Sequence, residues 1–350
     1  MTADSIACRR ETAYIQAAIL RLGRKSVCGM EIKVRRAYIT GATGAIGMAL
    51  TAKLLKENIN VTVFLRRGSA RNERFDMFAE EQRTGRLKLV YVDLEELAEY
   101  CTKEHQERCR EDVFYHLGWS GTFGAARNDR KLQQDNIEYT LDAVGLAERL
   151  GCGRFVGAGS QAEYGRPDGV LTPDIPAAPE NEYGKAKLEA GIESRKLCQE
   201  FGIMHCWVRI LSVYGPYDGD DTMIMSTIRK LILGQDVPLT AGVQLWDYLY
   251  SEDAADAMYR MGELPWTDRS KLYCLASGEA KPLKEYILML CSQAGADEAL
   301  LKFGAVAYTD TQVMRLTADI HALTEDTGFR AQTTFQDGIK KTIDWRKNIG

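Results

Sequence analysis

The chain has 350 residues, enough for about two domains of 150 residues or for one large α/β unit. Apolar residues make up 45% and charged residues 27%, as in an ordinary globular protein. The net charge of −4 and the absence of an apolar run of membrane-spanning length argue against nucleic acid and membranes as partners.

Nine cysteines show no Cys-x-x-Cys pair and no regular spacing, which indicates neither a disulfide framework nor a zinc site. The four histidines also lack ligand spacing, so we predict no metal. Free thiols suit a reducing compartment, and we therefore predict a cytoplasmic location.

Residues 1–29 differ from the rest of the chain because they are basic and poor in acidic residues. They contain no apolar stretch of secretory length, although an arginine-rich leader also resembles a transit peptide. We predict an N-terminal extension outside the fold, not necessarily native. Met30 is a candidate translation start, because the first predicted strand begins a few residues later.

Beyond this segment, predicted strands alternate with predicted helices. Strands are expected at 35–40, 61–65, 87–92, 113–117, 154–158 and 204–211, and helices at 45–57, 71–82, 93–108, 136–150 and 183–201. This alternation predicts a doubly wound parallel sheet. A proline-rich stretch at 160–182 interrupts the rhythm, and a connection of this length is typical of a segment near a functional site.

The pattern changes after about residue 212. Helices are expected near 221–233, 252–262 and 281–295, between short strands near 237–239, 245–250 and 271–275. We therefore predict a cofactor-binding domain at 30–212 and a smaller α/β substrate lobe at 213–350, which need not be continuous in sequence.

A glycine-rich turn, GATGAIG at 41–47, follows the first strand and opens the first helix. Glycines at Gly41, Gly44 and Gly47 would let the backbone approach a pyrophosphate, which the amides of the helix N-terminus bind. The turn therefore predicts a dinucleotide site that also includes Thr43 and Ile46. The alternative is a tight turn without a ligand.

Four arginines follow the second strand within nine residues: Arg66, Arg67, Arg71 and Arg74. An acidic residue at the end of this strand would favour NAD, whereas guanidinium groups bind the 2′-phosphate of NADP. We predict NADP, with NAD as the second choice and a solvated basic loop as the alternative for the cluster. Asp93, after the third strand, is placed either to contact the adenine or to cap the next helix.

Tyr183 and Lys187 are four residues apart and share one helical face. A tyrosine is normally protonated until about pH 10, but a nearby ammonium favours the phenolate and allows proton transfer at neutral pH. Ser160, after the fifth strand, could hydrogen-bond the reacting oxygen, and Asn136 could support a proton relay. In isolation, the Tyr-Lys spacing also fits an amphipathic surface helix.

Taken together, these motifs resemble the extended short-chain dehydrogenase/reductase superfamily, in its NAD-dependent epimerase/dehydratase branch, which acts on nucleotide sugars. The resemblance covers about residues 34–347. It rests on GATGAIG at 41–47, VDL at 92–94, HLG at 116–118, DNIEYTLDAVGLA at 135–147, GSQAEYG at 159–165, YGKAK at 183–187, VYGP at 213–216 and WDYLYSEDAADA at 246–257.

The resemblance implies a Rossmann-like cofactor domain and dimers built from two long helices of each subunit. It implies that Ser160, Tyr183 and Lys187 form a catalytic triad and that Lys187 also holds the nicotinamide ribose. Further cofactor-lining positions are Asp93, Leu94, His116, Leu117 and Gly118. For His116, an ordinary hydrogen-bonded histidine at a strand end is the alternative.

Two departures from the family pattern narrow the reaction. Gln161 and Ala162 stand where 4,6-dehydratases have an Asp-Glu pair, which disfavours water elimination. Trp246 stands where many members have an arginine that binds the substrate diphosphate. Arg229 or Lys230 could replace it, but we favour the interpretation that both are exposed helix charges.

We predict an NADPH-dependent 4-keto-sugar reductase acting on a nucleotide sugar. One alternative is a nucleotide-sugar epimerase that retains NAD(P), and others are a reductase of a non-nucleotide ketone and a non-catalytic NADP-sensing protein. A serine-hydrolase interpretation of the segment around Ser160 leaves the glycine turn unexplained.

Overall fold

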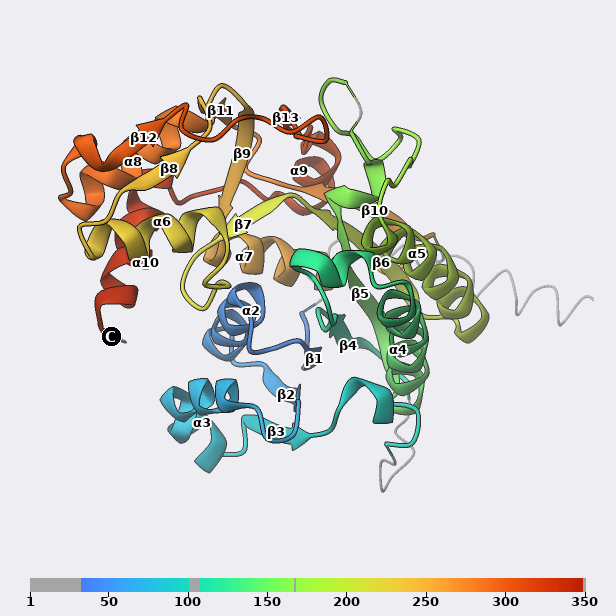
Figure 1. Cartoon of the computed structure of the whole chain (residues 1–350). Coiled ribbons are helices and arrows are strands. Elements are labelled where there is room, and N and C mark those ends of the chain that lie inside the picture. Colours follow the sequence, from blue (N-terminus) through green and yellow to red (C-terminus); the bar gives the residue numbers. More distant parts are fainter. Residues whose placement is uncertain (1–32, 101–107, 167, 268, 349–350) are drawn as a thin grey trace, which may run out of the picture. The chain divides into compact units, whose positions relative to one another are not determined.

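The computed structural model describes residues 33–100, 108–166, 168–267 and 269–348, so the predicted extension at 1–29 lies outside the described residues. A seven-stranded parallel sheet forms the centre of the fold, which confirms the predicted Rossmann-like, doubly wound architecture (Figure 1). Its strands are β1 (Arg36–Thr40), β2 (Asn60–Leu65), β3 (Leu87–Tyr91), β4 (Cys109–His116), β5 (Cys152–Ser160), β6 (Met204–Ile210) and β10 (Lys271–Leu275).

The strand order is β10-β6-β5-β4-β1-β2-β3. From β1, the next strands β2 and β3 are added toward one edge of the sheet, whereas β4, β5 and β6 are added toward the other edge. The order of the strands therefore reverses between β1 and β4. Ligands of such sheets bind at this reversal, beyond the carboxyl ends of the strands.

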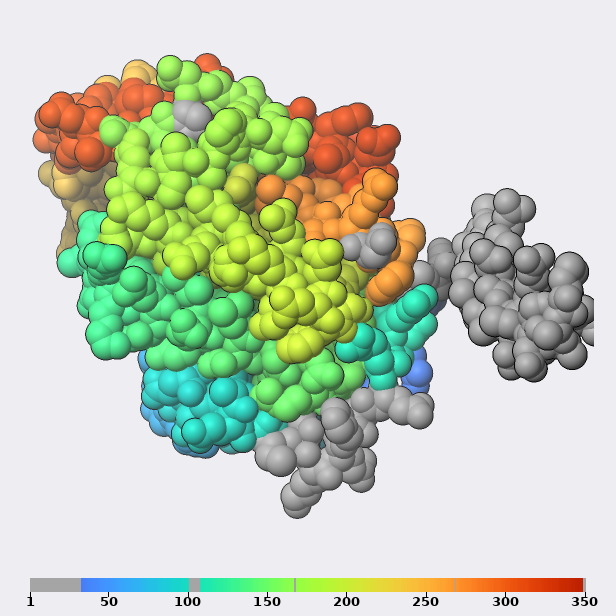
Figure 2. Space-filling model, turned by 90° about the vertical axis from the view of Figure 1, so that its right-hand side faces the viewer, coloured from blue at the N-terminus to red at the C-terminus, as the bar shows by residue number. Residues whose placement is uncertain are grey.

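Helices cover both faces of this sheet, as parallel strands require. On one face lie α2 (Ala45–Lys56) and α7 (Ser251–Gly262), and on the other lie α4 (Arg130–Arg149) and α5 (Glu182–Phe201). Figure 2 views the surface that α4 and α5 form. Every residue of β5 is buried, because this strand lies in the middle of the sheet.

The strand at 271–275 does not belong to the smaller lobe, where the sequence analysis placed it. As β10 it pairs in parallel with β6 and completes the large sheet. A local sequence pattern predicts a strand but not the strand with which it pairs. Here the backbone N–H and C=O groups at the edge of β6 pair with those of β10. The lobe boundary at residue 212 stays a prediction.

Two expected helices also differ from the structure. The helix expected at 71–82 is a 3-10 helix, η1 (Ala70–Phe78), followed by the short α3 (Ala79–Arg83). For the helix expected at 93–108, the structure has the 3-10 turn η2 (Leu94–Glu96), and residues 101–107 lie outside the described ranges. Both segments are mostly polar, so they offer few apolar side chains to bury against the sheet.

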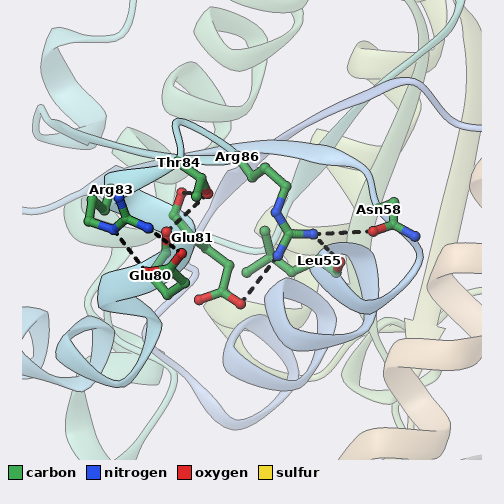
Figure 3. Close-up of polar contacts among 7 residues, drawn as sticks. All are labelled: Leu55, Asn58, Glu80, Glu81, Arg83, Thr84 and Arg86. Atoms are coloured by element: carbon green, nitrogen blue, oxygen red, sulfur yellow. Dashed lines mark hydrogen bonds and ion pairs between the residues drawn. The ribbon is translucent and has the colours of Figure 1, made fainter.

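Arg86 connects the first two helices before the chain enters β3 (Figure 3). Its guanidinium donates to the carbonyl oxygen of Leu55 at 3.2 Å and to the side chain of Asn58 at 3.3 Å, and it pairs with Glu81 at 3.3 Å. Arg86 thus adds a side-chain donor to the Leu55 carbonyl oxygen, which also accepts from the amide of Asn58 at 3.1 Å.

The smaller lobe is built on two short sheets. One contains β7 (Ser212–Tyr214), β9 (Leu245–Tyr250), β11 (Ala280–Pro282) and β13 (Arg315–Leu316), and the other pairs β8 (Val237–Leu239) with β12 (Leu301–Phe303). The other elements of this part of the chain are α6 (Met223–Ile232), α8 (Leu283–Ala294), η5 (Glu298–Leu300), α9 (His321–Thr327) and α10 (Phe335–Asn348). No helix in the described ranges is both long and apolar enough to cross a membrane.

Candidate active site

The glycine turn lies at the carboxyl end of β1, beside the reversal of the strand order. Gly41 has a φ of +70°, and a Cβ there would lie 2.5 Å from the amide nitrogen of Gly118. A Cβ on Gly47 would overlap with the carbonyl oxygen of Gly41. The N-terminus of α2 has no side-chain cap at Gly44. This open cradle, with free amides at a helix start, fits a dinucleotide pyrophosphate.

The segment after β4 forms the second wall of the cradle. Leu117 and Gly118 donate their amides to the carbonyl oxygen and the hydroxyl of Thr40, at 3.2 and 3.3 Å. His116 is buried, with one ring nitrogen 2.8 Å from the Thr40 hydroxyl and the other 3.3 Å from that of Thr140. Burial lowers the pKa of His116 to about 3, so the ring is neutral. These two hydrogen bonds fit an ordinary histidine at a strand end, and the position of His116 in the cofactor lining stays a prediction.

Leu94 packs against Gly118 in the same wall. The contact is so close that a Cβ on Gly118 would lie 2.9 Å from a methyl group of Leu94. Asp93 precedes η2, where its amide donates to Glu96 at 3.1 Å and its carboxylate accepts from the amide of Arg67 at 3.0 Å. Asp93 thus forms a capping box with Glu96 at the start of η2, and its contact with the adenine stays a prediction.

Of the four arginines after β2, two have exposed side chains without a described ion pair, and the other two contact neighbouring groups. Arg66 and Arg71 are exposed, without a described ion pair. Arg67 is also exposed but forms an ion pair with Glu96, which raises the pKa of the guanidinium. Arg74 is half-buried and donates to the carbonyl oxygen of Thr43 inside the glycine turn. Of the two predicted phosphate-binding arginines, Arg66 and Arg67, only Arg66 therefore has an unengaged side chain.

The three residues of the predicted triad come together at the start of α5. Asn181 caps this helix by accepting from the amide of Gly184 at 2.8 Å, and Tyr183 follows directly. Ser160, at the carboxyl end of β5, is near enough to lower the pKa of the Tyr183 phenol. Lys187, one turn later, donates to the carbonyl oxygen of Ala158 at 2.6 Å.

The ionisable groups of this trio are buried, and burial determines their charge. It raises the pKa of Tyr183, against a hydrogen bond from Ser160 and the positive charge of Arg127. It lowers the pKa of Lys187 to about 7, against the negative charge of Glu163. In the protein without ligands, Tyr183 is therefore a protonated phenol at neutral pH, and Lys187 is only partly charged.

Asn136 is buried on α4 and holds the loop that follows β4. Its amide oxygen accepts from the backbone of Ser120 at 2.8 Å, and its nitrogen donates to the carbonyl oxygens of Ser120 and Leu132 at 3.0 and 2.8 Å. These bonds give Asn136 a clear anchoring function. Its part in a proton relay stays a prediction.

Sequence reasoning missed a buried charge pair beneath Ser160. Glu163, in the 3-10 turn η4 (Gln161–Tyr164), accepts from the amide of Ser160 at 2.8 Å and from the indole of Trp207 at 3.0 Å. Its second oxygen accepts from Arg209 at 2.7 Å. The guanidinium lies 4.3 Å from the centre of the Tyr164 ring. The only available signal in the sequence was an acidic residue within GSQAEYG at 159–165, a segment that is otherwise uncharged.

Trp246, which stands where many family members have an arginine, and its neighbour Asp247 both form hydrogen bonds inside the smaller lobe. Trp246 donates its indole N–H to Ser212 at 2.8 Å, and the carboxylate of Asp247 accepts from Ser277 at 2.7 Å. Arg229 is exposed on α6 and Lys230 is partly exposed beside it. Among the described residues, no group of three histidine, cysteine or acidic side chains could hold a metal ion.

Known proteins with similar sequences or folds include nucleotide-sugar epimerases and dehydratases. A UDP-glucose 4-epimerase from Corynebacterium glutamicum is 23% identical over 267 residues, 72% of this chain and 78% of the relative. A dTDP-glucose 4,6-dehydratase from Neisseria meningitidis serogroup B is 22% identical over 346 residues, 89% and 93% of the two chains. A solved UDP-glucuronic acid 4-epimerase from Bacillus cereus, in complex with UDP-glucuronic acid and NAD, is 19% identical, with a TM-score of 0.75 over 90% of this chain and 100% of that one.

The family model for NAD dependent epimerases and dehydratases matches residues 37–274. This range spans most of the chain and includes the glycine turn, strands β2 to β6 in full, all but one residue each of β1 and β10, and the Ser160–Tyr183–Lys187 site. The chain belongs to the NAD dependent epimerase/dehydratase family, within the extended short-chain dehydrogenases/reductases.

Proposed function

We propose that this protein is an NADPH-dependent reductase of a 4-keto sugar carried on a nucleotide. The observation that carries the proposal is the assembly of Ser160, Tyr183 and Lys187 beside the glycine cradle. When bound, the nicotinamide supplies the hydride. The chain's own residues then need to orient a carbonyl group and deliver one proton to its oxygen.

Each residue of the trio has a role in this reaction. Ser160 orients the sugar carbonyl by donating a hydrogen bond, and Tyr183 gives its phenolic proton to the oxygen. Lys187 stabilises the resulting phenolate and holds the nicotinamide ribose. Because burial raises the pKa of Tyr183, the phenol carries its proton at neutral pH, as a reduction requires.

Two features support the choice of cofactor and reaction. Arg66 is exposed directly after β2, where a 2′-phosphate of NADP would lie. Gln161 and Ala162 cannot act as the acid and base of a dehydratase, because neither side chain ionises.

An epimerase with retained NAD is the second candidate. The ion pair of Arg67 with Glu96 favours this candidate. It occupies the Arg67 guanidinium and puts a carboxylate near the place of a 2′-phosphate, so that NAD would bind more easily than NADP. The Bacillus cereus structure named above also contains NAD. A reductase of a non-nucleotide ketone would have the same cofactor domain.

The deciding experiment incubates the pure protein with NADPH or NADH and a panel of NDP-4-keto-6-deoxy-sugars, nucleotide sugars and simple ketones. NADPH oxidation with a keto sugar is the expected result. Interconversion of unreduced nucleotide sugars without net NADPH oxidation would establish the epimerase instead, and reduction of simple ketones alone would establish the non-nucleotide reductase.

The variant Tyr183→Phe tests the catalytic assignment. Loss of general acid catalysis should lower kcat by about 10²–10⁴-fold, while NADPH binding, followed by fluorescence, stays within about threefold of wild type. Tyr139→Phe is the matched control, because this tyrosine is partly exposed on α4, outside the trio, and its substitution should leave kcat unchanged. Full activity in Tyr183→Phe would contradict the assignment, and unchanged biological function would favour a sensor.

We further propose a homodimer that associates through α4 and α5, which pack together on one face of the sheet. Sedimentation velocity tests it, and a strictly monomeric protein at micromolar concentration would contradict it. The described cysteines Cys109, Cys152, Cys198, Cys206, Cys274 and Cys291 are free thiols, which supports a reducing, cytoplasmic compartment. Fractionation of the source cells would check this location.

A further inference from the structure

The loop between β4 and α4 brings two side chains against Tyr183. Trp119 meets the phenol ring edge-on, with the ring centres 6.1 Å apart and the planes at 86°. Arg127, in the 3-10 turn η3 (Gly124–Asn128), places its guanidinium carbon 4.3 Å from the centre of the Tyr183 ring. The phenol ring therefore contacts both an indole ring and a cation.

Buried residues of α4 hold this loop in place. The amide oxygen of Gln133 accepts from the indole of Trp119 at 2.9 Å, and its nitrogen donates to the carbonyl oxygens of Gly121 and Ala126, each at 2.9 Å. Gln133 is 1% exposed. Together with Asn136, it fixes both ends of the segment that carries Arg127. The guanidinium is thus presented to Tyr183 by an anchored loop.

Four other groups determine the electrostatic surroundings of Tyr183. Lys187 lies on the same helix, with Nζ 6.0 Å from the ring centre, and also contacts the Trp119 ring at 3.7 Å. Glu163 contributes a negative charge from η4, and Ser160 contributes a hydrogen bond from the end of β5. His116, on β4, faces Lys187 as a neutral ring.

The two cations differ in how constant their charge is. Burial lowers the pKa of Lys187 to about 7, so its charge is partial at neutral pH without ligands. A guanidinium cannot be deprotonated under these conditions. A cation within about 6 Å of a ring attracts it, and the attraction grows when the ring itself becomes an anion.

We propose that Arg127 is a positioning residue that supplies the permanent positive charge for Tyr183 and stabilises its phenolate. The inference rests on the proposed role of Tyr183 in proton transfer. It predicts that removal of the Arg127 charge makes the phenolate harder to form and therefore raises the pKa of Tyr183.

The test measures the ionisation of Tyr183 directly, without cofactor or substrate. Tyrosinate absorbance near 295 nm is recorded by rapid pH jump, and the Tyr183 signal is isolated by subtracting the same titration of the matching Tyr183→Phe variant. In Arg127→Gln the midpoint should rise by roughly half to one pH unit, the size expected for one nearby charge. Arg127→Lys keeps the charge and should stay close to wild type.

Arg130→Gln is the control, because Arg130 is an exposed residue three positions further along the chain. An unchanged midpoint in Arg127→Gln would overturn the proposal. So would equal shifts in Arg127→Gln and Arg127→Lys, because they would point to displacement of the loop. Once a substrate is known, the alkaline limb of the kcat profile for reduction should move to higher pH in Arg127→Gln, with KM little changed.

The outcomes separate this inference from the proposed function. A raised midpoint together with no turnover on any keto sugar would leave Arg127 acting on Tyr183 and reject the reductase. Turnover of a keto sugar with an unchanged midpoint would reject the role of Arg127 alone.

Discussion

His205 is an uncharged ring inside the sheet. It stacks between Phe155 and Trp207, with both ring-centre distances at 6.1 Å, and one ring nitrogen lies 3.0 Å from the hydroxyl of Ser194. The other, Nδ1, has no hydrogen-bond partner among the described residues. Burial lowers the pKa of His205 to about 3. The folded protein therefore takes up a proton here far less readily than the unfolded chain.

This difference predicts a loss of stability in acid. The unfolded histidine titrates near about pH 6.5, so between pH 6.5 and 3 only the unfolded state binds the proton, and the free energy of unfolding falls as the pH falls. His205→Phe keeps the stack and should reduce the loss between pH 7.5 and 5 by about 2 kcal/mol in urea titrations. His321→Phe is the control, because His321 is exposed. Equal pH slopes in wild type and His205→Phe would contradict this prediction.

The Glu163–Arg209 pair has the opposite character, since both charges are buried and paired. Glu163→Gln should lower the free energy of unfolding by about 3–5 kcal/mol, because it leaves the Arg209 guanidinium buried without a counter-charge. Urea unfolding gives the measurement. Glu180→Gln, which breaks an exposed pair with Arg166, should cost less than about 1 kcal/mol. Similar costs for the two variants would show that burial of the pair is unimportant.

At the scale of elements, the connection from β1 to α2 depends on close backbone approach. Gly47 lies in the first turn of α2, where a side chain would meet the backbone of Gly41 and Ala42. Gly145 also lies within a helix, α4, but its nearest neighbour is the flexible end of Arg149 at 3.4 Å. The two helical glycines therefore make a matched pair.

Gly47→Ala should weaken cofactor binding by at least about tenfold, because the turn must open to admit the methyl group and the helix amides then move away from the pyrophosphate. Gly145→Ala should leave binding unchanged and raise stability by up to about 1 kcal/mol. NADPH fluorescence titration and thermal unfolding measure both effects. Wild-type affinity in Gly47→Ala would show that the turn does not hold the cofactor.

At the scale of the whole described molecule, Arg74 links the glycine turn to the smaller lobe. It donates to the carbonyl oxygen of Thr43 and, at 3.4 Å, to that of Tyr217. Tyr217 has a φ of +68°, and its ring packs against Trp345 of α10, 5.0 Å between centres. Arg74 thus joins the glycine turn to the loop after β7, and Tyr217 joins that loop to the C-terminal helix.

Arg74→Met should therefore loosen both parts. We expect a loss of about 1–2 kcal/mol in the free energy of unfolding, because two carbonyls lose their donor. Hydrogen exchange of residues 215–222 should become faster. Arg71→Met is the control, because Arg71 is exposed. Unchanged exchange in Arg74→Met would show that the bridge does not hold the loop.

Features that depend on neighbouring residues could be predicted from the amino-acid sequence. The glycine spacing at Gly41, Gly44 and Gly47 predicted the turn between β1 and α2, and the alternation of strands and helices predicted the parallel sheet. The four-residue spacing of Tyr183 and Lys187 placed both on one face of α5. These signals are readable because helix and strand periodicity relate residues that are only a few positions apart.

Contacts between distant segments could be read only from the folded chain. Arg127 and Tyr183 lie in separate elements. Glu163 lies in a 3-10 turn and its partner Arg209 in a strand, and β10 pairs with β6 although β7, β8 and β9 lie between them in the sequence. No local period links such residues, because burial and the pairing of backbone and charge select among many partners only when the chain is packed. The same packing lowers the pKa of Lys187, and so makes Arg127 the constant charge beside Tyr183.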